Sequence, residues 1–325
     1  MNNIHSREAE CYMKNKEKPI INPYITLIIG VSAVSTSAIF VKLATAPAPI
    51  IATYRLLFTF LLMTPIFLLF YRHELKDIKK KDWIFSTLSG VFLAFHFILW
   101  FESLNYTSVA SSVVLVTLQP LFSVIGAYFL FKERVPMKAI LGGSLAIAGS
   151  FFIGWGDFKI GGMALFGDIL ALLGAIMVTA YWLCGQDIRK RLSLITYTYV
   201  VYGASSLTLV IYNLALGYSF FPYPTMDWVY FLSLALFPTL LGHTLFNWAI
   251  RWLNASTISM SILGEPIGSA ILAYFILGEV INTTQYIGGA LILFGIYAFI
   301  KWNEQTKTNP SFENCRDSHP ANSNF

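Results

Sequence analysis

The stretch NASTISMSILGEPIGSAILAYFILGE, from Asn254 to Glu279, is apolar and long enough to cross a lipid bilayer as one helix. A carboxylic acid, Glu265, lies near its middle, and Pro266 follows it directly. An ionisable side chain at that depth costs about 2.5 to 3.5 kcal/mol on insertion scales, so it must be neutralised, paired or hydrated. The stretch therefore predicts a membrane-spanning helix built around a polar site.

The same pattern occurs earlier in the chain, as NYTSVASSVVLVTLQPLFSVIGAYFLFKE from residue 105 to 133, with Gln119 in the place of Glu265. The two positions are 146 residues apart (265 − 119). Glu133 and Glu279 share this separation, and so do Gly149 and Gly295. We predict that the second half of the chain repeats the first.

The composition is that of an integral membrane protein. Hydrophobic residues make up 56% of the chain, charged residues 12%, and the mean hydropathy is +0.63, whereas about a quarter of residues are charged in soluble domains. Cys11, Cys184 and Cys315 have no metal-ligand spacing. We predict no disulfide framework, no metal and no cofactor.

Ten apolar segments of near-spanning length follow a polar N-terminal tail, residues 1–22. A signal peptide is a weaker reading of the first segment, which exceeds the usual 7 to 15 apolar residues. The predicted spans are 24–44, 49–71, 83–104, 107–131, 137–155, 164–186, 193–214, 227–250, 255–277 and 281–302.

The loops on one side of the predicted membrane hold nearly all of the 22 Lys and Arg residues, and Lys159 is alone on the other side. Positive loops stay in the cytoplasm, so both termini are predicted to be cytoplasmic. This distribution also makes topology a better explanation of the net charge of +5 than nucleic-acid binding.

Each half contains an odd number of predicted helices, so the second half enters the membrane from the opposite face. The fold class is therefore an all-α membrane protein of ten transmembrane helices, two inverted five-helix repeats around a central cavity. The predicted units are an N-tail (1–22), repeat 1 (23–156), repeat 2 (163–302) and a disordered cytoplasmic C-tail (303–325). Inverted repeats are typical of carriers that open alternately to the two sides.

Pro120 and Pro266 should kink the two central helices at matching depth, because each leaves a carbonyl without its helical partner. Glu265 and Gln119 would then face a polar cavity. For Glu265, an ionisable group in transport and a structural hydrogen bond are both open interpretations. The nearby Gly and Ser positions are explained as well by close helix packing.

Two pairs with i, i+4 spacing could complete the site: His96 with Trp100 in the third segment, and His243 with Asn247 in the eighth. Histidine at such depth could relay protons or bind substrate, or it could form an ordinary interhelical hydrogen bond. Trp100 could stack on a ligand or anchor the interface. Tyr181 in the sixth segment is predicted to contribute to substrate binding.

Lys42 and Arg55 lie near the outer ends of the first two segments. Snorkelling to the headgroups is the default for such residues. The alternative is a cavity mouth, where with Glu102 they would serve in ion coupling or gating. The sequence leaves both open.

These features resemble the EamA family of the drug/metabolite transporter superfamily. The resemblance covers residues 24–302 and rests on the repeated five-helix pattern, the Pro-to-Glu spacings and the Gly-Gly motif that closes each half. It implies ten helices around a central cavity and export or exchange of small metabolites such as amino acids. Val178 stands where many members carry Trp, and it is followed by Tyr181 and Trp182.

We therefore predict a secondary or facilitative transporter in the plasma membrane, not an enzyme, with no nucleotide-binding loop and with proton coupling as an open question. Its partners would be a small-molecule substrate and the lipid bilayer, with no nucleic acid, and the chain would be a monomer or a homodimer. An intramembrane enzyme is the main alternative, since Gly154-Trp155-Gly156-Asp157 matches a GxGD motif but has no second midplane Asp. A channel or sensor is a further alternative.

Overall fold

The computed structural model describes residues 19–107, 109–154, 162–278, 281 and 283–308. Within these ranges the chain is helical and contains no strand. In this described part of the chain, nine helical spans are long and apolar enough to cross a membrane, and a shorter apolar helix covers Met137–Ile153. The predicted C-tail from 309 and the GxGD match from Trp155 onward lie outside the described residues.

The first half contains α2 (Pro23–Val34), α3 (Thr36–Leu43), α4 (Ala48–Ile66), the π-helical η1 (Phe67–Tyr71), the 3₁₀ turn η2 (Arg72–Lys76), α5 (Lys80–Ser103), α6 (Val109–Val116), α7 (Gln119–Phe131) and α8 (Met137–Gly154). The second half contains α9 (Gly162–Ile188), α10 (Leu194–Leu216), α11 (Thr225–Leu234), the π-helical η3 (Ala235–His243), α12 (Thr244–Ala249), α13 (Ala255–Ile262), α14 (Glu265–Leu277) and α15 (Thr283–Thr308).

The helix boundaries repeat with the separation seen in the sequence. Adding 146 to the bounds of α6 and α7 gives those of α13 and α14, and the first residue of α8 maps onto that of α15. Both central spans are divided, because two residues separate the end of α6 from Gln119 and two separate the end of α13 from Glu265. Each second helix carries proline at its second position, where a missing N–H is tolerated.

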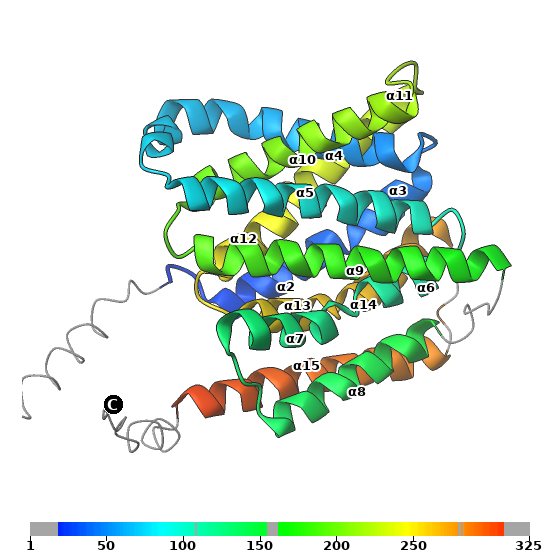
Figure 1. Cartoon of the computed structure of the whole chain (residues 1–325). Coiled ribbons are helices and arrows are strands. Elements are labelled where there is room, and N and C mark those ends of the chain that lie inside the picture. Colours follow the sequence, from blue (N-terminus) through cyan, green and yellow to red (C-terminus); the bar gives the residue numbers. More distant parts are fainter. Residues whose placement is uncertain (1–18, 108, 155–161, 279–280, 282, 309–325) are drawn as a thin grey trace, which may run out of the picture.

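The helices run side by side, with α8 and α15 along one edge of the bundle and α4, α10 and α11 along the opposite edge (Figure 1). Helix α2 begins and α15 ends at the same end of the bundle. Helix α15 continues to Thr308, beyond the predicted span end at 302.

Glycines allow α8 and α15 to pack closely. A Cβ on Gly288 would lie 2.5 Å from the carbonyl oxygen of Gly149, and one on Gly295 would lie 2.5 Å from the amide nitrogen of Ala146. Close backbone approach of this kind is how helices associate where lipid removes the hydrophobic driving force.

Candidate functional site

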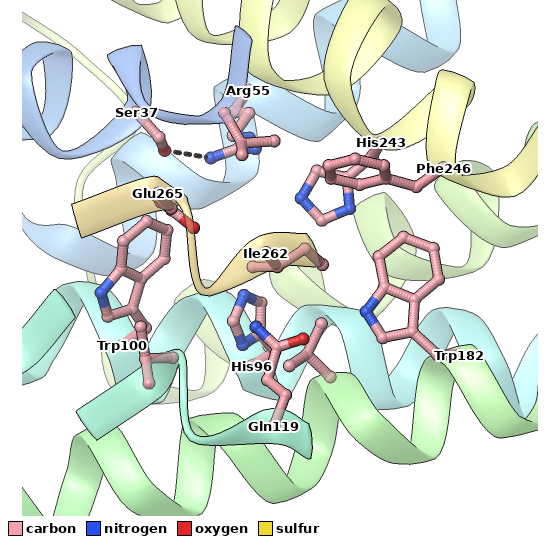
Figure 2. Close-up of a pocket in the computed structure, with 13 residues that line it drawn as sticks. Ser37, Arg55, His96, Trp100, Gln119, Trp182, His243, Phe246, Ile262 and Glu265 are labelled. Carbon is pink, nitrogen blue, oxygen red and sulfur yellow. Dashed lines mark hydrogen bonds between the residues drawn. The ribbon is translucent and has the colours of Figure 1, made fainter. Parts of the chain in front are cut away.

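Three helix breaks meet at one buried cavity in the centre of the bundle. Val34 and Ser37 flank the break between α2 and α3, Val116 and Gln119 the break between α6 and α7, and Ile262 and Glu265 the break between α13 and α14. The remaining lining residues come from α4, α5, α9, η3 and α12: Arg55, His96, Trp100, Val178, Trp182, His243 and Phe246 (Figure 2).

The cavity volume is about 20 Å³, which is room for about one water molecule. The breaks explain why a polar cavity can exist at this depth, since interrupted helices expose backbone groups only where they face protein or a cavity. A metabolite is therefore too large for the cavity at this volume and needs a wider one.

Arg55 is fully buried and held by three other spans. Its Nε donates to Thr239 Oγ1 at 2.8 Å and its Nη1 to Ser37 Oγ at 2.7 Å. The guanidinium carbon lies 4.1 Å from the centre of the Phe97 ring, which is cation–π distance. The structure therefore fixes a cation in the core and excludes snorkelling for Arg55, whereas Lys42 is exposed.

Glu265 is only 5% exposed, and its Oε1 has no hydrogen-bond partner. It lies beside Arg55 in Figure 2. Among the described residues, no ion pair within 4.0 Å joins the two. A buried acid and a buried base therefore share one cavity without contacting each other directly, which leaves both available to a third charged group.

Two stacked indole–imidazole pairs form other walls of the cavity. The rings of His96 and Trp100 are 5.7 Å apart with an interplanar angle of 23°, and those of Trp182 and His243 are 5.6 Å apart at 11°. His96 Nδ1 lies 2.9 Å from the Gly174 carbonyl oxygen, so this nitrogen is the donor, and in the neutral ring Nε2 is an acceptor.

The cavity holds several polar atoms without hydrogen-bond partners. They are the indole nitrogens of Trp100 and Trp182, Nδ1 of His243, and Oε1 of Gln119 and of Glu265. Unpartnered polar groups are rare in native interiors, and each one needs an explanation. A cavity that collects both donors and acceptors is suited to a polar ligand or water.

His243 is the last residue of the π-helical segment η3. His96 and His243 are 147 positions apart (243 − 96), one more than the repeat separation. A π-helical turn accommodates one extra residue, and such turns are frequent at functional sites. The histidines of the third and eighth spans therefore lie at nearly equivalent positions of the two halves.

Most of the predicted binding residues line this cavity: His96, Trp100, Gln119, His243 and Glu265. Tyr181 and Asn247 do not line it. They lie behind it, where Asn247 Nδ2 donates to the Tyr181 hydroxyl and the Tyr181 ring is 4.3 Å from that of Trp182. Their position suits them to orient Trp182 and His243.

Of the residues predicted to serve in gating, some line the cavity and others do not. Arg55 lines the cavity, but Glu102 lies near the end of α5, where it accepts a hydrogen bond from Asn105 Nδ2 at 3.3 Å. The sequence predicts a site among the third, fourth, sixth, eighth and ninth spans. Ser37 and Trp182 also line the cavity but are not among the predicted site residues. Trp182 could have been found, because it lies four residues after Val178 on one helical face.

The end of the bundle that is predicted to be cytoplasmic is closed by two polar clusters. In the first, Glu133 accepts from Gln186 Nε2 at 2.7 Å and from Asn254 Nδ2 at 3.1 Å. Gln186 Oε1 also accepts from the backbone amide of Ala255 at 2.6 Å. We call Glu133, Gln186 and Asn254 the latch, because they join the ends of α7 and α9 to the start of α13.

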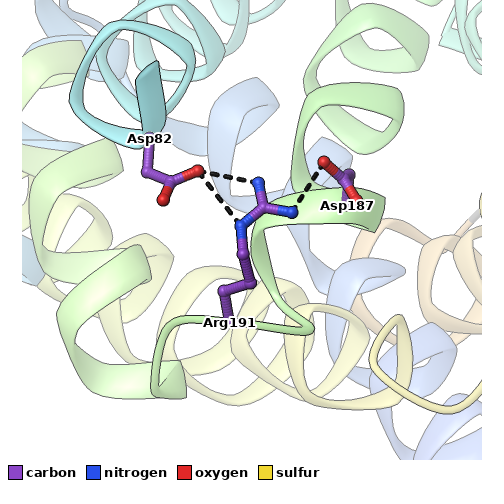
Figure 3. A network of polar contacts seen from close by, with 3 residues as sticks. All are labelled: Asp82, Asp187 and Arg191. Carbon is purple, nitrogen blue, oxygen red and sulfur yellow. Dashed lines mark hydrogen bonds and ion pairs between the residues drawn. The ribbon is translucent and has the colours of Figure 1, made fainter. Parts of the chain in front are cut away.

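The second cluster ties the start of α5 to the turn after α9 (Figure 3). Arg191 Nη2 lies 2.7 Å from Asp82 Oδ1, and its Nη1 lies 2.8 Å from Asp187 Oδ2. These hydrogen bonds to Asp82 and Asp187 raise the pKa of Arg191 above its ordinary value, so the guanidinium stays charged. At the other end of the bundle, Thr45 donates its amide and hydroxyl to Asp227 at 3.0 and 2.8 Å.

Within the described ranges, no group of three His, Cys, Asp or Glu side chains converges in a way that could hold a metal ion. The cavity's donors and acceptors are suited to reversible binding.

Fold and site together define a helical membrane protein with a central binding cavity, the class to which secondary carriers belong. The sequence matches the EamA-like transporter family twice, over residues 22–155 and 165–301. The chain belongs to this family, within the drug/metabolite transporter superfamily, and is a membrane transporter.

Several relatives support this assignment. An uncharacterized transporter of Archaeoglobus fulgidus is 25% identical over 86% of this chain and 95% of its own length. The uncharacterized transporter YetK of Bacillus subtilis is 27% identical over 91% and 92% of the two chains. The riboflavin transporter ImpX of Fusobacterium nucleatum is 25% identical over 73% and 83%. A solved crystal structure superposes with a TM-score of 0.70 at 17% identity, covering 88% of this chain and 99% of the other, and shows the fold alone.

Proposed function

We propose that this protein is a secondary carrier of the plasma membrane that exports or exchanges small zwitterionic metabolites, such as amino acids and related compounds. It would work by alternating access between two inverted repeats of five helices, with both termini in the cytoplasm. The twofold family match and the repeated helix boundaries support this arrangement. We also maintain that it is not an enzyme.

The unpaired Glu265 and Arg55 in one buried cavity carry the proposal. A substrate carboxylate would bind the Arg55 guanidinium, whose geometry suits carboxylates. A substrate ammonium would bind Glu265, whose Oε1 has no partner. Such a zwitterion satisfies both buried charges at once, which neither a simple cation nor a simple anion does.

The same geometry supplies a hypothesis for proton coupling. A carboxylate enclosed at this depth without direct pairing is strongly unfavourable, so Glu265 must be neutralised before the cavity closes. Either a proton or the substrate's ammonium group could do this. Competition between the two at one side chain would exchange protons for substrate.

The stacked rings indicate that the substrate carries a flat group. The rings of Trp100, Trp182 and both histidines line the cavity. The ring nitrogens without a hydrogen-bond partner are those of Trp100, Trp182 and His243 Nδ1. Aromatic amino acids fit this description. Riboflavin is a second candidate, because the relative ImpX is named a riboflavin transporter and a flavin ring is flat with several acceptors.

Counterflow in proteoliposomes tests the proposal. Purified protein would be reconstituted with unlabelled compound inside and labelled compound outside, using aromatic amino acids, their decarboxylated amines, their deaminated acids and riboflavin. We expect saturable exchange of the amino acids, weaker exchange of the amines and acids, and chemically unchanged substrate afterwards. Equal exchange of all three classes would contradict recognition of a zwitterion, and a converted product would indicate an enzyme.

A further inference from the structure

A second hollow opens on the membrane-facing side of the bundle, between α2 on one side and α13, α14 and α15 on the other. Its volume is about 430 Å³, far larger than that of the central cavity. The lining includes the small residues Ser35, Gly264 and Gly268 and the large aliphatic residues Ile28, Ile271 and Leu293. We call this hollow the lateral groove.

The groove exists because α15 packs along α8 over most of its length and touches α13 and α14 only sparsely. Ile28, Ile271 and Leu293 are 68%, 45% and 62% exposed. These helices are membrane spans, so the exposed surface faces hydrocarbon. Water would find few hydrogen-bond partners in this apolar lining, whereas an acyl chain would make van der Waals contacts along it.

A cation lies beside one end of the groove. Tyr24, Tyr297 and Ile300 line that end, and Lys301 Nζ lies 5.6 Å from the centre of the Tyr297 ring. The neighbouring acid, Glu304, accepts a hydrogen bond from the Tyr24 hydroxyl. Tyrosine and lysine near the end of a membrane span, here Thr283–Glu304, are typical of the headgroup level of a bilayer.

The groove is separated from the central cavity by a single layer of contacts. Ser35 Oγ donates to the backbone oxygen of Glu265 at 3.3 Å, and Ser269 Oγ donates to the backbone oxygen of Ser35 at 3.1 Å. Ser35 is also the residue at which α2 gives way to α3. A molecule in the groove therefore lies against two of the three helix breaks that form the site.

We propose that the lateral groove binds one acyl chain of an anionic phospholipid, with the lipid phosphate against Lys301. The chain fills the gap that α15 leaves beside α13 and α14, and the phosphate supplies the anion that Lys301 can hold at headgroup depth. This binding site is independent of the transported substrate.

Native mass spectrometry of the full-length protein tests the proposal, with dioleoyl phosphatidylglycerol and dioleoyl phosphatidylcholine as probes. We expect one lipid molecule per protein to bind more tightly than all others. At this site phosphatidylglycerol should bind about fivefold more tightly than phosphatidylcholine, the ratio expected from one lysine at the membrane surface. Leu293→Trp, which fills the groove, should abolish tight binding of both lipids. Lys301→Gln should remove the preference and leave the binding.

Two matched controls separate the groove from the general surface. Phe294 is the exposed neighbour of Leu293 and does not line the groove, so Phe294→Trp should retain the tight lipid. Lys138 is exposed at the start of α8, so Lys138→Gln should retain the preference. If Leu293→Trp does not fold, Ile28→Trp fills the groove from α2 instead.

Equal lipid binding in Leu293→Trp and Phe294→Trp would overturn the proposal, and so would equal affinity for the two lipids in the wild type. A wild-type dimer that Leu293→Trp converts to a monomer would also overturn it, because the groove would then be an interface between copies.

Discussion

At the scale of single residues, the central question is how a carboxylic acid and a guanidinium persist in the core of a membrane protein. Arg55 is bound by Ser37, Thr239 and Phe97, so its position is fixed before any ligand arrives. Glu265 has no such support for its Oε1. The site thus combines one preorganised charge with one that awaits a partner, a division suited to a carrier that must release what it binds.

Replacing Glu265 by Gln should abolish both the pH dependence of exchange and the preference for a free ammonium group. The amide is neutral at every pH, so protons and ammonium groups no longer compete for it. We expect a loss of about 30-fold in amino-acid affinity, as for removal of one member of a buried charge pair. Exchange measured at two internal pH values and against the deaminated acids checks this.

Glu102→Gln is the matched control, since Glu102 lies near the end of α5 and does not line the cavity. It should exchange normally at both pH values. Unchanged flux and pH dependence in Glu265→Gln, with the variant folded, would remove this carboxylate from the mechanism.

Trp182→Phe should have opposite effects on stability and binding. The indole N–H is buried without a partner, so its removal should leave the thermal stability equal or slightly higher. The ring stack on His243 is retained, but a substrate acceptor loses its donor, and affinity should fall by about fivefold to tenfold. Thermal unfolding and counterflow on one preparation measure both quantities.

Trp228→Phe serves as the comparison, because Trp228 packs on Tyr54 away from the cavity, with ring centres 4.8 Å apart. It should leave affinity unchanged. A loss of affinity of equal size in both variants would mean that Trp182 acts through general packing.

At the scale of helices, the two halves solve the same problems with different residues. The residue that caps the C-terminus of α7 is Lys132, with φ of 56°, and the one that caps α14 is Gly278, with φ of 71°. The two positions are 146 residues apart (278 − 132). A side chain costs about 1 kcal/mol in this left-handed conformation, and glycine avoids that cost.

Lys132→Gly should therefore stabilise the protein by about 1 kcal/mol. Lys132→Ala separates the effect of charge from that of backbone strain, because it removes the ammonium group but keeps a Cβ. Midpoints of thermal unfolding in detergent should rise for glycine only. An equal rise for alanine would attribute the gain to the charge.

The contact between α8 and α15 gives a sharper contrast, because two adjacent glycines face different surroundings. A Cβ on Gly288 would lie 2.5 Å from the Gly149 backbone oxygen, whereas the nearest atom to a Cβ on Gly289 is 3.8 Å away, on Ile267. Gly288→Ala should destabilise by about 1 to 3 kcal/mol through overpacking. Gly289→Ala should be neutral, or stabilising by up to about 1 kcal/mol through helix propensity.

Thermal unfolding of the two variants in the same detergent measures this difference. Equal stability of Gly288→Ala and Gly289→Ala would contradict close backbone packing between α8 and α15.

At the scale of the whole molecule, the sequence predicts the position of nearly every helix, because runs of apolar residues with polar ends identify spans directly. It also predicts which spans are special, because a charge or a proline within such a run is costly. It cannot separate Lys42 from Arg55, since both are basic residues near span ends. The hydroxyls of Ser37 and Thr239 and the ring of Phe97, brought together from distant spans, stabilise the buried guanidinium of Arg55.

The same limit applies to the third helix break. Proline marks two breaks in the sequence, but Ser35 carries no comparable signal. It is placed at a break by its tertiary contacts with Glu265 and Ser269. Because no metabolite fits in about 20 Å³, the proposed transport requires one end of the bundle to open. We expect the polar contacts at each end to determine which one does.

Releasing the latch should open the cavity towards the end that is predicted to be cytoplasmic. Glu133 holds Gln186 and Asn254 at 2.7 and 3.1 Å, so Glu133→Ala frees the ends of α7, α9 and α13 from one another. Asp227→Ala removes the contacts to Thr45 at the other end and is the matched variant. Two-state carriers shift their populations when contacts specific to one state are removed.

The measurement is the labelling rate of a cysteine at Ser37 in the cavity by a membrane-impermeant maleimide, in a background without Cys11, Cys184 and Cys315. We expect Glu133→Ala to raise labelling from the cytoplasmic side by about tenfold, and Asp227→Ala to raise it from the outer side, for a shift of roughly 1.4 kcal/mol in each direction. Because each variant predicts the side as well as the rate, the pair also tests the orientation of the chain. Faster labelling from both sides in either variant would indicate general loosening, and the contacts at the two ends would then not act as gates.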